Sequence, residues 1–186
     1  MKIHEFVPGG PVIITPNIFN DERGYFFESF NEKEFREKVA NVDFVQDNES
    51  LSSENVIRGL HFQKPPYAQA KLVRVINGAV IDVVVDIRKN SPTYGKFFQV
   101  YLSGTNHKQF FVPQGFAHGF VSLKPDTLFQ YKCDNFYNKE SEGCILYNDL
   151  TIAIPWENWV HKSQQIVSEK DKQGILFENF ETPFTY

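Results

Sequence analysis

Short runs in which apolar and polar residues alternate make up most of the chain between residues 12 and 147. Alternation with a period of two is typical of β-strands that bury one face, and clusters of turn-forming residues separate the runs. The pattern predicts strands at 12–15, 25–30, 55–63, 71–76, 79–87, 97–102, 109–112, 119–123, 128–133 and 142–147. Short strands at this spacing, with few helices, predict an all-β fold that is closed into a barrel or stacked as a sandwich.

One pair of neighbouring strands is set apart by the Asn77-Gly78 dipeptide, which separates the runs at 71–76 and 79–87. Asn-Gly between two such runs predicts a β-hairpin. In the second strand, Asp82 and Asp86 share a face with valines. A buried carboxylate without a partner is costly, so we expect at least one of the two to be paired.

Helical patterns are confined to two short segments. Asn31 is placed to cap a helix over 32–39, with Glu34 at the capping-box position. Ser168 stands before Glu169-Lys170-Asp171, where a second short helix is expected to begin. No linker, low-complexity tract or repeat interrupts the chain, so residues 1–186 are expected to form one domain.

Composition narrows the class of protein. The chain has 186 residues, of which 41% are hydrophobic and 16% aromatic, enough for one substantial core. A net charge of −4 and the lack of basic runs argue against nucleic-acid binding. No apolar run approaches the roughly 20 residues of a membrane helix, and residues 1–5 lack the character of a signal peptide. We therefore expect a cytoplasmic protein that makes no membrane contact, with Cys133 and Cys144 reduced.

Candidate chemistry lies in two segments, Arg58-Gly59-Leu60-His61 and Pro113-Gln114-Gly115-Phe116-Ala117-His118. We expect His61 and His118 to point into the mouth of a barrel, with Lys71 on a strand between them. Strict alternation would place Arg58 and His61 on opposite faces, so a bulge at Gly59 is predicted to turn both inward. A base, a cation and a second imidazole suit proton abstraction next to a carbonyl.

Each of these residues also has an ordinary structural interpretation. A lone strand histidine such as His61 is more often hydrogen-bonded in a core, and Arg58 and Arg74 suit the exterior of a barrel. Gln46-Asp47-Asn48 is equally compatible with a polar loop, and Tyr131 with a sheet aromatic. Lys71 is harder to explain in this way, because its strand parity places it with valines and an ammonium there is costly unless the face opens to a ligand.

Metal binding is a further possibility that the spacing disfavours. Pro113-x-Gly115-x-x-His118 resembles the second motif of the cupins, the jelly-roll superfamily, and Gly59-Leu60-His61-Phe62-Gln63 occupies the place of the first. In metal-binding cupins the first motif supplies two histidines one residue apart and a glutamate, whereas here Gln63 replaces the second histidine. Two imidazoles are too few for a catalytic metal, which normally takes three protein ligands. We therefore expect no metal.

Taken together, motifs along nearly the whole chain resemble one family, the dTDP-4-dehydrorhamnose 3,5-epimerases of deoxysugar biosynthesis. They are Asp21-Glu22-Arg23-Gly24-x-x-x-Glu28, Gln46-Asp47-Asn48, Arg58-Gly59-Leu60-His61-Phe62-Gln63, Lys71-Leu72-Val73-Arg74-Val75, Asp82-Val83-Val84-Val85-Asp86-Ile87-Arg88, Ser91-Pro92-Thr93-Tyr94-Gly95-Lys96, Pro113-x-Gly115-Phe116-Ala117-His118-Gly119-Phe120, Tyr131-Lys132 and Ser168-Glu169-Lys170-Asp171.

The resemblance implies a cupin-like jelly-roll homodimer without a cofactor, acting on dTDP-4-keto-6-deoxy-D-glucose to give dTDP-4-keto-L-rhamnose. It implies that His61 is the general base, Asp171 its orienting carboxylate and Tyr131 the general acid on the opposite face. Lys71 and His118 would lie near the sugar and stabilise the enolate. The other positions implied to bind substrate are Arg23 and Glu28, acting across the dimer, and Gln46, Asn48, Arg58, Tyr137, Glu142 and Lys170, with Tyr137 stacking on thymine.

Three other functions stay open at this point. A related epimerase could invert only C3 or only C5 of a dTDP-4-keto-deoxysugar. A cupin oxygenase or isomerase would depend on a metal. A binding module would hold the same sugar nucleotide without turnover.

Overall fold

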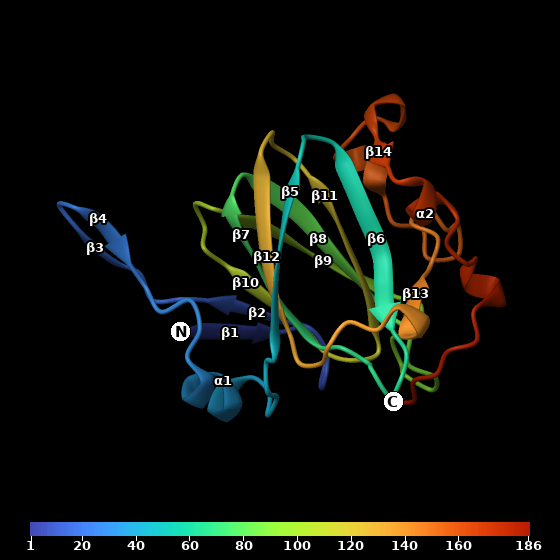
Figure 1. The fold of residues 1–186 in the computed structure, drawn as a ribbon, viewed down its shortest axis with the longest axis horizontal. Helices are drawn as coiled ribbons and strands as arrows, with labels where there is room; N and C mark the ends of the chain where they lie inside the picture. The colour runs from blue at the N-terminus through green and yellow to red at the C-terminus, as the bar shows by residue number, and fades with distance from the viewer.

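The computed structural model describes all 186 residues as two facing antiparallel sheets, with a short hairpin projecting from one side (Figure 1). The first sheet runs in the order β1-β2-β10-β7-β12-β5 and the second in the order β13-β6-β11-β8-β9, with β14 parallel to one end of β6. The strands of the first sheet are β1 (Lys2–Glu5), β2 (Val12–Thr15), β5 (Gln46–Ser52), β7 (Lys71–Asn77), β10 (Gln109–Val112) and β12 (Thr127–Cys133). Those of the second are β6 (Val56–Gln63), β8 (Ala79–Asp86), β9 (Phe97–Ser103), β11 (Phe116–Ser122), β13 (Glu142–Cys144) and β14 (Ile166–Val167). The all-β prediction is confirmed.

The remaining elements are small. The hairpin consists of β3 (Phe19–Asp21) and β4 (Gly24–Phe26), and the two α-helices are α1 (Glu32–Lys38) and α2 (Glu169–Lys172). Four 3₁₀ turns lie at Lys139–Ser141, Trp156–Asn158, Lys162–Gln164 and Phe177–Asn179. No helix of the structure has the length and apolar character needed to cross a membrane.

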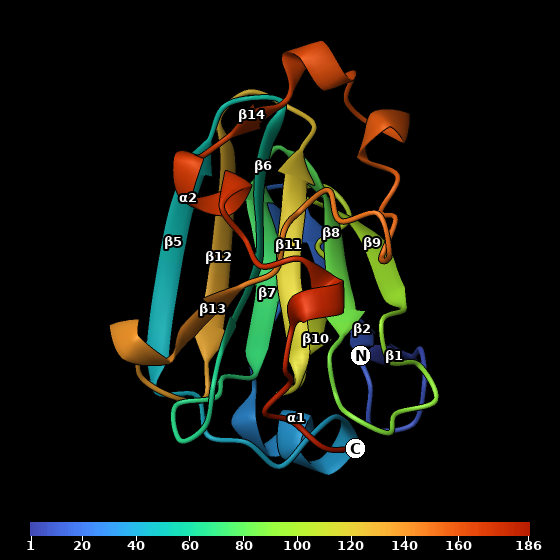
Figure 2. The ribbon, with the colours of Figure 1, turned by 90° about the vertical axis from the view of Figure 1, so that its right-hand side faces the viewer.

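Apolar side chains pack in three layers around the two sheets. The middle layer lies between the sheets and includes Phe110, Phe129 and Phe120. A second layer covers the outer face of the β6-β11-β8 sheet and includes Trp156. The C-terminal segment crosses this face of the sheet (Figure 2). A third lies under α1, through Phe35, on the outer face of the other sheet. Each sheet is thus covered on both faces over much of its area.

The predicted hairpin between residues 71–76 and 79–87 is wrong. β7 and β8 belong to opposite sheets, β7 pairing with β10 and β12 and β8 with β11 and β9. Gly78 makes the corner with φ at +82°, and a Cβ there would lie 2.4 Å from Thr127 Oγ1. All eight residues of β8 are buried, because β11 and β9 pair with it on either side and apolar layers cover both of its faces.

Several strands differ from the prediction, and the run at 142–147 forms strand only over β13. The run at 25–30 forms strand only over β4 and pairs with β3, while β11 begins three residues before the predicted start at residue 119. β5 was not predicted, because its residues are mostly polar and alternate between half-buried and exposed. Backbone pairing with β12 forms that strand, and its inward side chains face a cavity instead of the apolar core.

Both predicted helix caps are confirmed. Asn31 Oδ1 accepts from the Glu34 amide at 3.2 Å, and Ser168 Oγ accepts from the Asp171 amide at 3.1 Å. The second cap fixes the short turn that carries Lys170 and Asp171.

Both carboxylates of β8 have partners, whereas the sequence predicted a partner for at least one of them. Asp86 accepts from Arg88, Ser91 and Thr93 in a buried network, and Asp82 pairs with His118.

Candidate active site

A cavity of about 290 Å³ opens between the two sheets. It is lined by Gln46 and Asn48 of β5, His61, Phe62 and Gln63 of β6, Gln69, Lys71 of β7, Tyr131 of β12, and Tyr137 and Glu142. Its size approaches the range of small-molecule sites, about 300–1,000 Å³. Seven of the sequence-predicted site residues line this one space: Gln46, Asn48, His61, Lys71, Tyr131, Tyr137 and Glu142.

A bulge in β6 aims His61 at this cavity, as predicted. In the pairing with β11, His118 lies opposite His61 but Phe120 lies opposite Arg58, so β6 carries one extra residue. Gly59 has φ at +122°, and a Cβ on it would lie 2.6 Å from the Cα of Gly119. The extra residue places Ile57 and Leu60 together in the outer core, which leaves Arg58 and His61 on the face toward the other sheet.

His61 is paired with Asp171, which lies 110 residues away in the sequence. The His61 Nε2 lies 2.6 Å from Asp171 Oδ1, and Asp171 Oδ2 accepts from the Gly59 amide at 3.3 Å. Burial raises the pKa of Asp171, but the hydrogen bonds and the charge of His61 outweigh that effect and hold the pKa below its ordinary value. The carboxylate therefore stays ionised and fixes the ring, while His61 Nδ1 has no hydrogen-bond partner in the protein.

Lys71 and Tyr131 stand on the opposite wall of the cavity from His61. The ammonium of Lys71 makes no ion pair in the protein and lies 5.8 Å from the centre of the Tyr131 ring. Burial lowers the pKa of Lys71, although the nearby carboxyl groups of Asp82 and Glu142 act in the opposite direction. Burial also raises the pKa of Tyr131, so its phenol keeps its proton at neutral pH. The site therefore presents a cation and a proton donor across from the imidazole.

His118 forms a second pair with a carboxylate, behind the cavity wall. Its Nε2 lies 3.0 and 2.9 Å from the two oxygens of Asp82, and both residues are buried. Burial raises the pKa of Asp82, although His118 and Lys71 act in the opposite direction. The expectation that His118 points into the open site is met only in part, because the residue lies across from His61 but does not line the cavity.

At the rim of the cavity, the side chains of Tyr137, Glu142 and Lys170 are linked by hydrogen bonds. Glu142 accepts from Tyr137 Oη at 3.2 Å through one oxygen and from Lys170 Nζ at 2.5 Å through the other. Burial raises the pKa of Glu142, but the Lys170 ammonium outweighs that effect and leaves it lowered. These contacts link α2, which also carries Asp171, to the loop that holds Tyr137.

Polar residues of β5 and β6 complete the rim. Gln46 accepts from the Tyr137 amide at 3.0 Å and donates to Asn48 Oδ1 at 3.0 Å. Asn48 in turn donates to the Cys133 thiol at 3.6 Å, and burial raises the pKa of that thiol to about 11. Arg58 is exposed and donates to Ser52 Oγ and to the Leu51 carbonyl.

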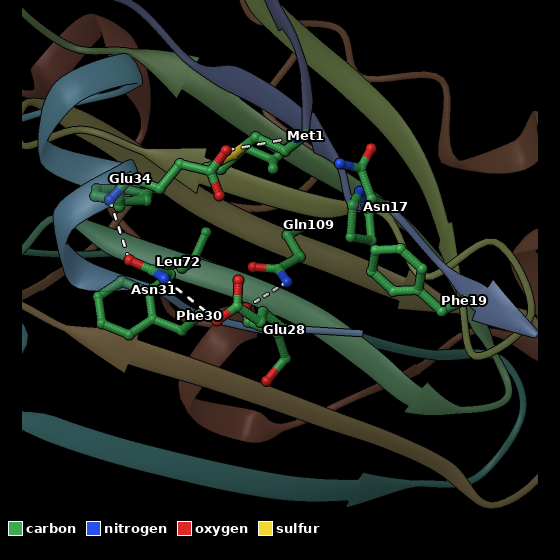
Figure 3. A pocket seen from close by; sticks show the side chains of 13 residues that line it. Met1, Asn17, Phe19, Glu28, Phe30, Asn31, Glu34, Leu72 and Gln109 are labelled. Carbon is green, nitrogen blue, oxygen red and sulfur yellow. Dashed lines mark hydrogen bonds and ion pairs between the residues drawn. The ribbon is translucent and has the colours of Figure 1, made fainter. Parts of the chain in front are cut away.

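Six of the predicted site residues do not line this cavity: Arg23, Glu28, Arg58, His118, Lys170 and Asp171. Of these, Arg23 and Glu28 belong to a different part of the chain, the β3–β4 hairpin and the segment that follows it. Arg23 is at the tip of the β3–β4 hairpin, where it pairs with Asp21 at 2.5 Å and its side chain is 85% exposed. Glu28 lines a separate cavity of about 120 Å³ beside Gln109 and Phe19 (Figure 3). Within one chain, both lie apart from His61.

Two residues at the site were not assigned a role from the sequence. Asp82 was expected only to have some partner, and that partner is His118. Gln63, which stands where metal-binding cupins have a second histidine, donates to the carbonyls of Tyr67 and Phe136 and accepts from the Asn138 amide. Its side chain thus holds the loop that carries Tyr137. The glutamine in place of a histidine was the available sequence signal.

The family model for dTDP-4-dehydrorhamnose 3,5-epimerase matches residues 8–179. The enzyme of that name from Shigella flexneri is 50% identical over 167 residues, covering 89% of this chain and 90% of its own. The crystal structure of a dTDP-4-dehydrorhamnose 3,5-epimerase from Elizabethkingia anophelis matches with a TM-score of 0.90 at 50% identity, covering 96% of this chain and 97% of its own. The dTDP-6-deoxy-D-glucose-3,5-epimerase of Legionella pneumophila, solved with dTDP-4-keto-L-rhamnose, matches with a TM-score of 0.90 at 44% identity, covering 97% and 94%.

Proposed function

This chain belongs to the dTDP-4-dehydrorhamnose 3,5-epimerase family, and we propose that it converts dTDP-4-keto-6-deoxy-D-glucose to dTDP-4-keto-L-rhamnose by inverting C3 and C5. The proposal rests on one observation: two side chains that can carry protons, His61 and Tyr131, face each other across one cavity. His61, tied to Asp171, projects from β6, and Tyr131 projects from β12 of the facing sheet.

In the first step, His61 takes the proton from the carbon next to the 4-keto group. Nδ1 is the atom that takes it, because Nε2 is held by Asp171. An ionised Asp171 stabilises the imidazolium that forms and fixes the tautomer with the lone pair on Nδ1.

The enolate that results needs positive charge at its oxygen. Lys71 supplies it, because its ammonium has no competing ion pair and is shielded from bulk water, where its charge is worth more than in solution. The buried His118–Asp82 pair lies behind this region and adds a fixed dipole and charge close to Lys71.

In the last step, a proton returns from the opposite face of the sugar. Tyr131 is the donor, since its raised pKa keeps the phenol protonated and it stands on the wall across from His61. A single group on one face could only restore the original configuration, so inversion requires the second carrier.

The nucleotide occupies the rim in this proposal. Tyr137 is exposed and stacks on thymine, while Arg58 and Lys170 offer donors to the diphosphate. Gln46, Asn48 and Glu142 bind the polar groups of the ligand. Arg23 and Glu28 reach the nucleotide of a second copy, which accounts for their distance from His61 in their own chain.

A homodimer is therefore part of the proposal. The β3–β4 hairpin projects from the body of the chain, and its residues Phe19, Tyr25 and Phe26 are 64%, 58% and 67% exposed (Figure 1). Three large aromatic side chains on one such hairpin are costly in water and are covered when the hairpin packs against a partner.

Phe26→Glu should shift the protein to a monomer by sedimentation and lower its activity. Leu150→Glu, at a site 92% exposed in a different region, should change neither. A fully active monomer would contradict the dimer.

The proposed reaction is tested by incubating the full chain with dTDP-4-keto-6-deoxy-D-glucose in heavy water. Nuclear magnetic resonance of the sugar should show deuterium at both C3 and C5 and the signals of the inverted product. Deuterium at one carbon only would instead identify a single-carbon epimerase. Binding without exchange would show a sugar-nucleotide binding module and overturn the enzymatic proposal.

A further inference from the structure

The thiol of Cys144 is a potential metal ligand beside the site, and the proposed reaction has no use for it. β13 places Cys144 directly opposite His61 of β6. The ligand atoms of His61, Cys144 and Asp171 all lie within 4.8 Å of one another. An imidazole, a thiol and a carboxylate thus converge on one point beside the cavity.

We propose that His61, Cys144 and Asp171 form a binding site for a thiophilic divalent cation of the zinc class, and that its occupation switches the enzyme off. Zinc takes nitrogen ligands at about 2.0–2.1 Å, sulfur at about 2.3 Å and oxygen at about 2.0–2.2 Å, usually in tetrahedral geometry. Ligand atoms around such an ion lie roughly 3–4 Å apart, so small side-chain movements bring the three into range. Three protein ligands leave the fourth position for water.

The surroundings support the ligand set. The second oxygen of Asp171 accepts from the Gly59 amide, and Ser168 caps the turn that carries Asp171. Ligand carboxylates in metal sites are held in this way by groups of the outer shell. A mixed nitrogen, sulfur and oxygen set favours zinc over magnesium or calcium, which prefer oxygen alone. The site shares His61 with the cupin metal position, but its other ligands are Cys144 and Asp171.

The ion would inhibit the enzyme by changing which nitrogen of His61 carries a proton. Zinc binds cysteine as the thiolate, so the ion must displace the proton of the Cys144 thiol. The ion also takes His61 Nε2, so the proton on that nitrogen moves to Nδ1. One proton is released in total, and Nδ1 no longer has the lone pair that abstracts the substrate proton. This part of the inference rests on the proposed function, whereas the binding of the ion does not.

Binding is tested on the full chain, purified without a histidine tag and stripped with a chelator. Titration with Co²⁺ should produce a thiolate-to-cobalt charge-transfer band that saturates at one ion per chain, and Zn²⁺ should displace it. Cys144→Ser should lose the band and bind zinc on the order of 100-fold more weakly, at least the effect of losing an outer-shell partner. Cys133→Ser is the matched control, because Cys133 lies outside the cluster, and should keep both.

Inhibition is tested by the solvent exchange of substrate protons at increasing zinc. The parent should lose exchange as the site fills and regain it with chelator, while Cys144→Ser should exchange normally and need on the order of 100-fold more zinc for the same loss. Absence of cobalt or zinc binding in the parent, or equal binding by Cys144→Ser, would overturn the site. Zinc that fills the site without slowing exchange would overturn the switch. A parent that binds zinc but never exchanges protons would contradict the proposed function while leaving the site intact.

Discussion

The molecule contains two histidine–aspartate pairs that lie side by side on neighbouring strands, and they differ in almost every property that matters for chemistry. His61 and His118 are direct partners in the register of β6 and β11. His61 is partly exposed, meets its carboxylate through one oxygen at 2.6 Å and keeps Nδ1 free. His118 is buried and faces both oxygens of Asp82 at 3.0 and 2.9 Å.

The pKa values of the two carboxyl groups, Asp171 and Asp82, are shifted in opposite directions. Hydrogen bonds from His61, Gly59 and Ser168 hold the pKa of Asp171 low, although burial acts against them. For Asp82 burial is the stronger influence and the pKa rises. We propose that the same residue pair serves proton transfer where the ring meets a cavity and has a fixed electrostatic role where it is enclosed. The difference comes from the bulge at Gly59, which turns His61 toward the cavity.

The largest effect should come from breaking the exposed pair. His61→Asn removes the base, so both deuterium exchange and inversion should fall by about 10⁴-fold, the upper end for a lost general base. His118→Asn, the matched variant on the neighbouring strand, should slow both but leave exchange measurable, because the base survives. Nuclear magnetic resonance of the sugar protons in heavy water measures the two together. An equal and complete loss in both variants would show that the pairs do not differ in role.

Lys71→Met tests the charge that stands near the enclosed pair. The variant should fold, because an apolar side chain of similar volume replaces a buried ammonium. Its turnover should fall by about 100–1,000-fold, the usual result of losing one preorganised donor to an oxyanion. Thermal unfolding checks the fold and the exchange assay checks the rate. Activity within a few-fold of the parent would remove Lys71 from the mechanism.

Tyr131→Phe separates proton removal from proton return. The His61–Asp171 pair is untouched, so deuterium should still enter the substrate, while inversion should fall by about 100-fold, typical of a lost general acid. The same spectra report both events, and the ratio of exchange to inversion is the measurement. Inversion of C3 and C5 at the parental rate would show that water or another residue is the acid.

Local patterns in the sequence predicted the parts of this arrangement that depend on near neighbours. The alternation in β8 correctly separated Ile81 and Val83 from Val80 and Val84, since strand parity is a local property. The Gly59 bulge was also predicted locally, from the need to turn Arg58 and His61 to one side. The Asn77-Gly78 hairpin failed because a turn pattern reports a change of direction but not which sheet the next strand joins.

Prediction of the site residues depended more on the family resemblance than on the pattern of apolar and polar residues. The pairing of His61 with Asp171 joins segments 110 residues apart, and no periodicity indicates such a contact. Polar β5 was missed because its inward residues, Gln46 and Asn48, face a ligand cavity and therefore lack the apolar signal of a strand. The approach of Cys144 to His61 follows from the β13–β6 register, which only the structure supplies.

The smallest expected effect, and the most direct comparison of the two carboxylates, is the pH dependence of stability. A carboxyl whose pKa is lowered by folding binds fewer protons in the folded state, so Asp171 adds stability as pH rises from its folded pKa to the ordinary aspartate value, about 3.9. A carboxyl whose pKa is raised binds more protons when folded, so the stabilisation of the folded protein by Asp82 decreases as pH rises from about 3.9 to its folded pKa.

Urea unfolding of the parent, Asp171→Asn and Asp82→Asn across acidic to neutral pH gives the free energy of unfolding for each. The advantage of the parent over Asp171→Asn should grow as pH rises below about 4, and its advantage over Asp82→Asn should shrink as pH rises above that value. Slopes of the same sign for both variants would show that the two pairs share one electrostatic environment, against the comparison drawn from their geometry.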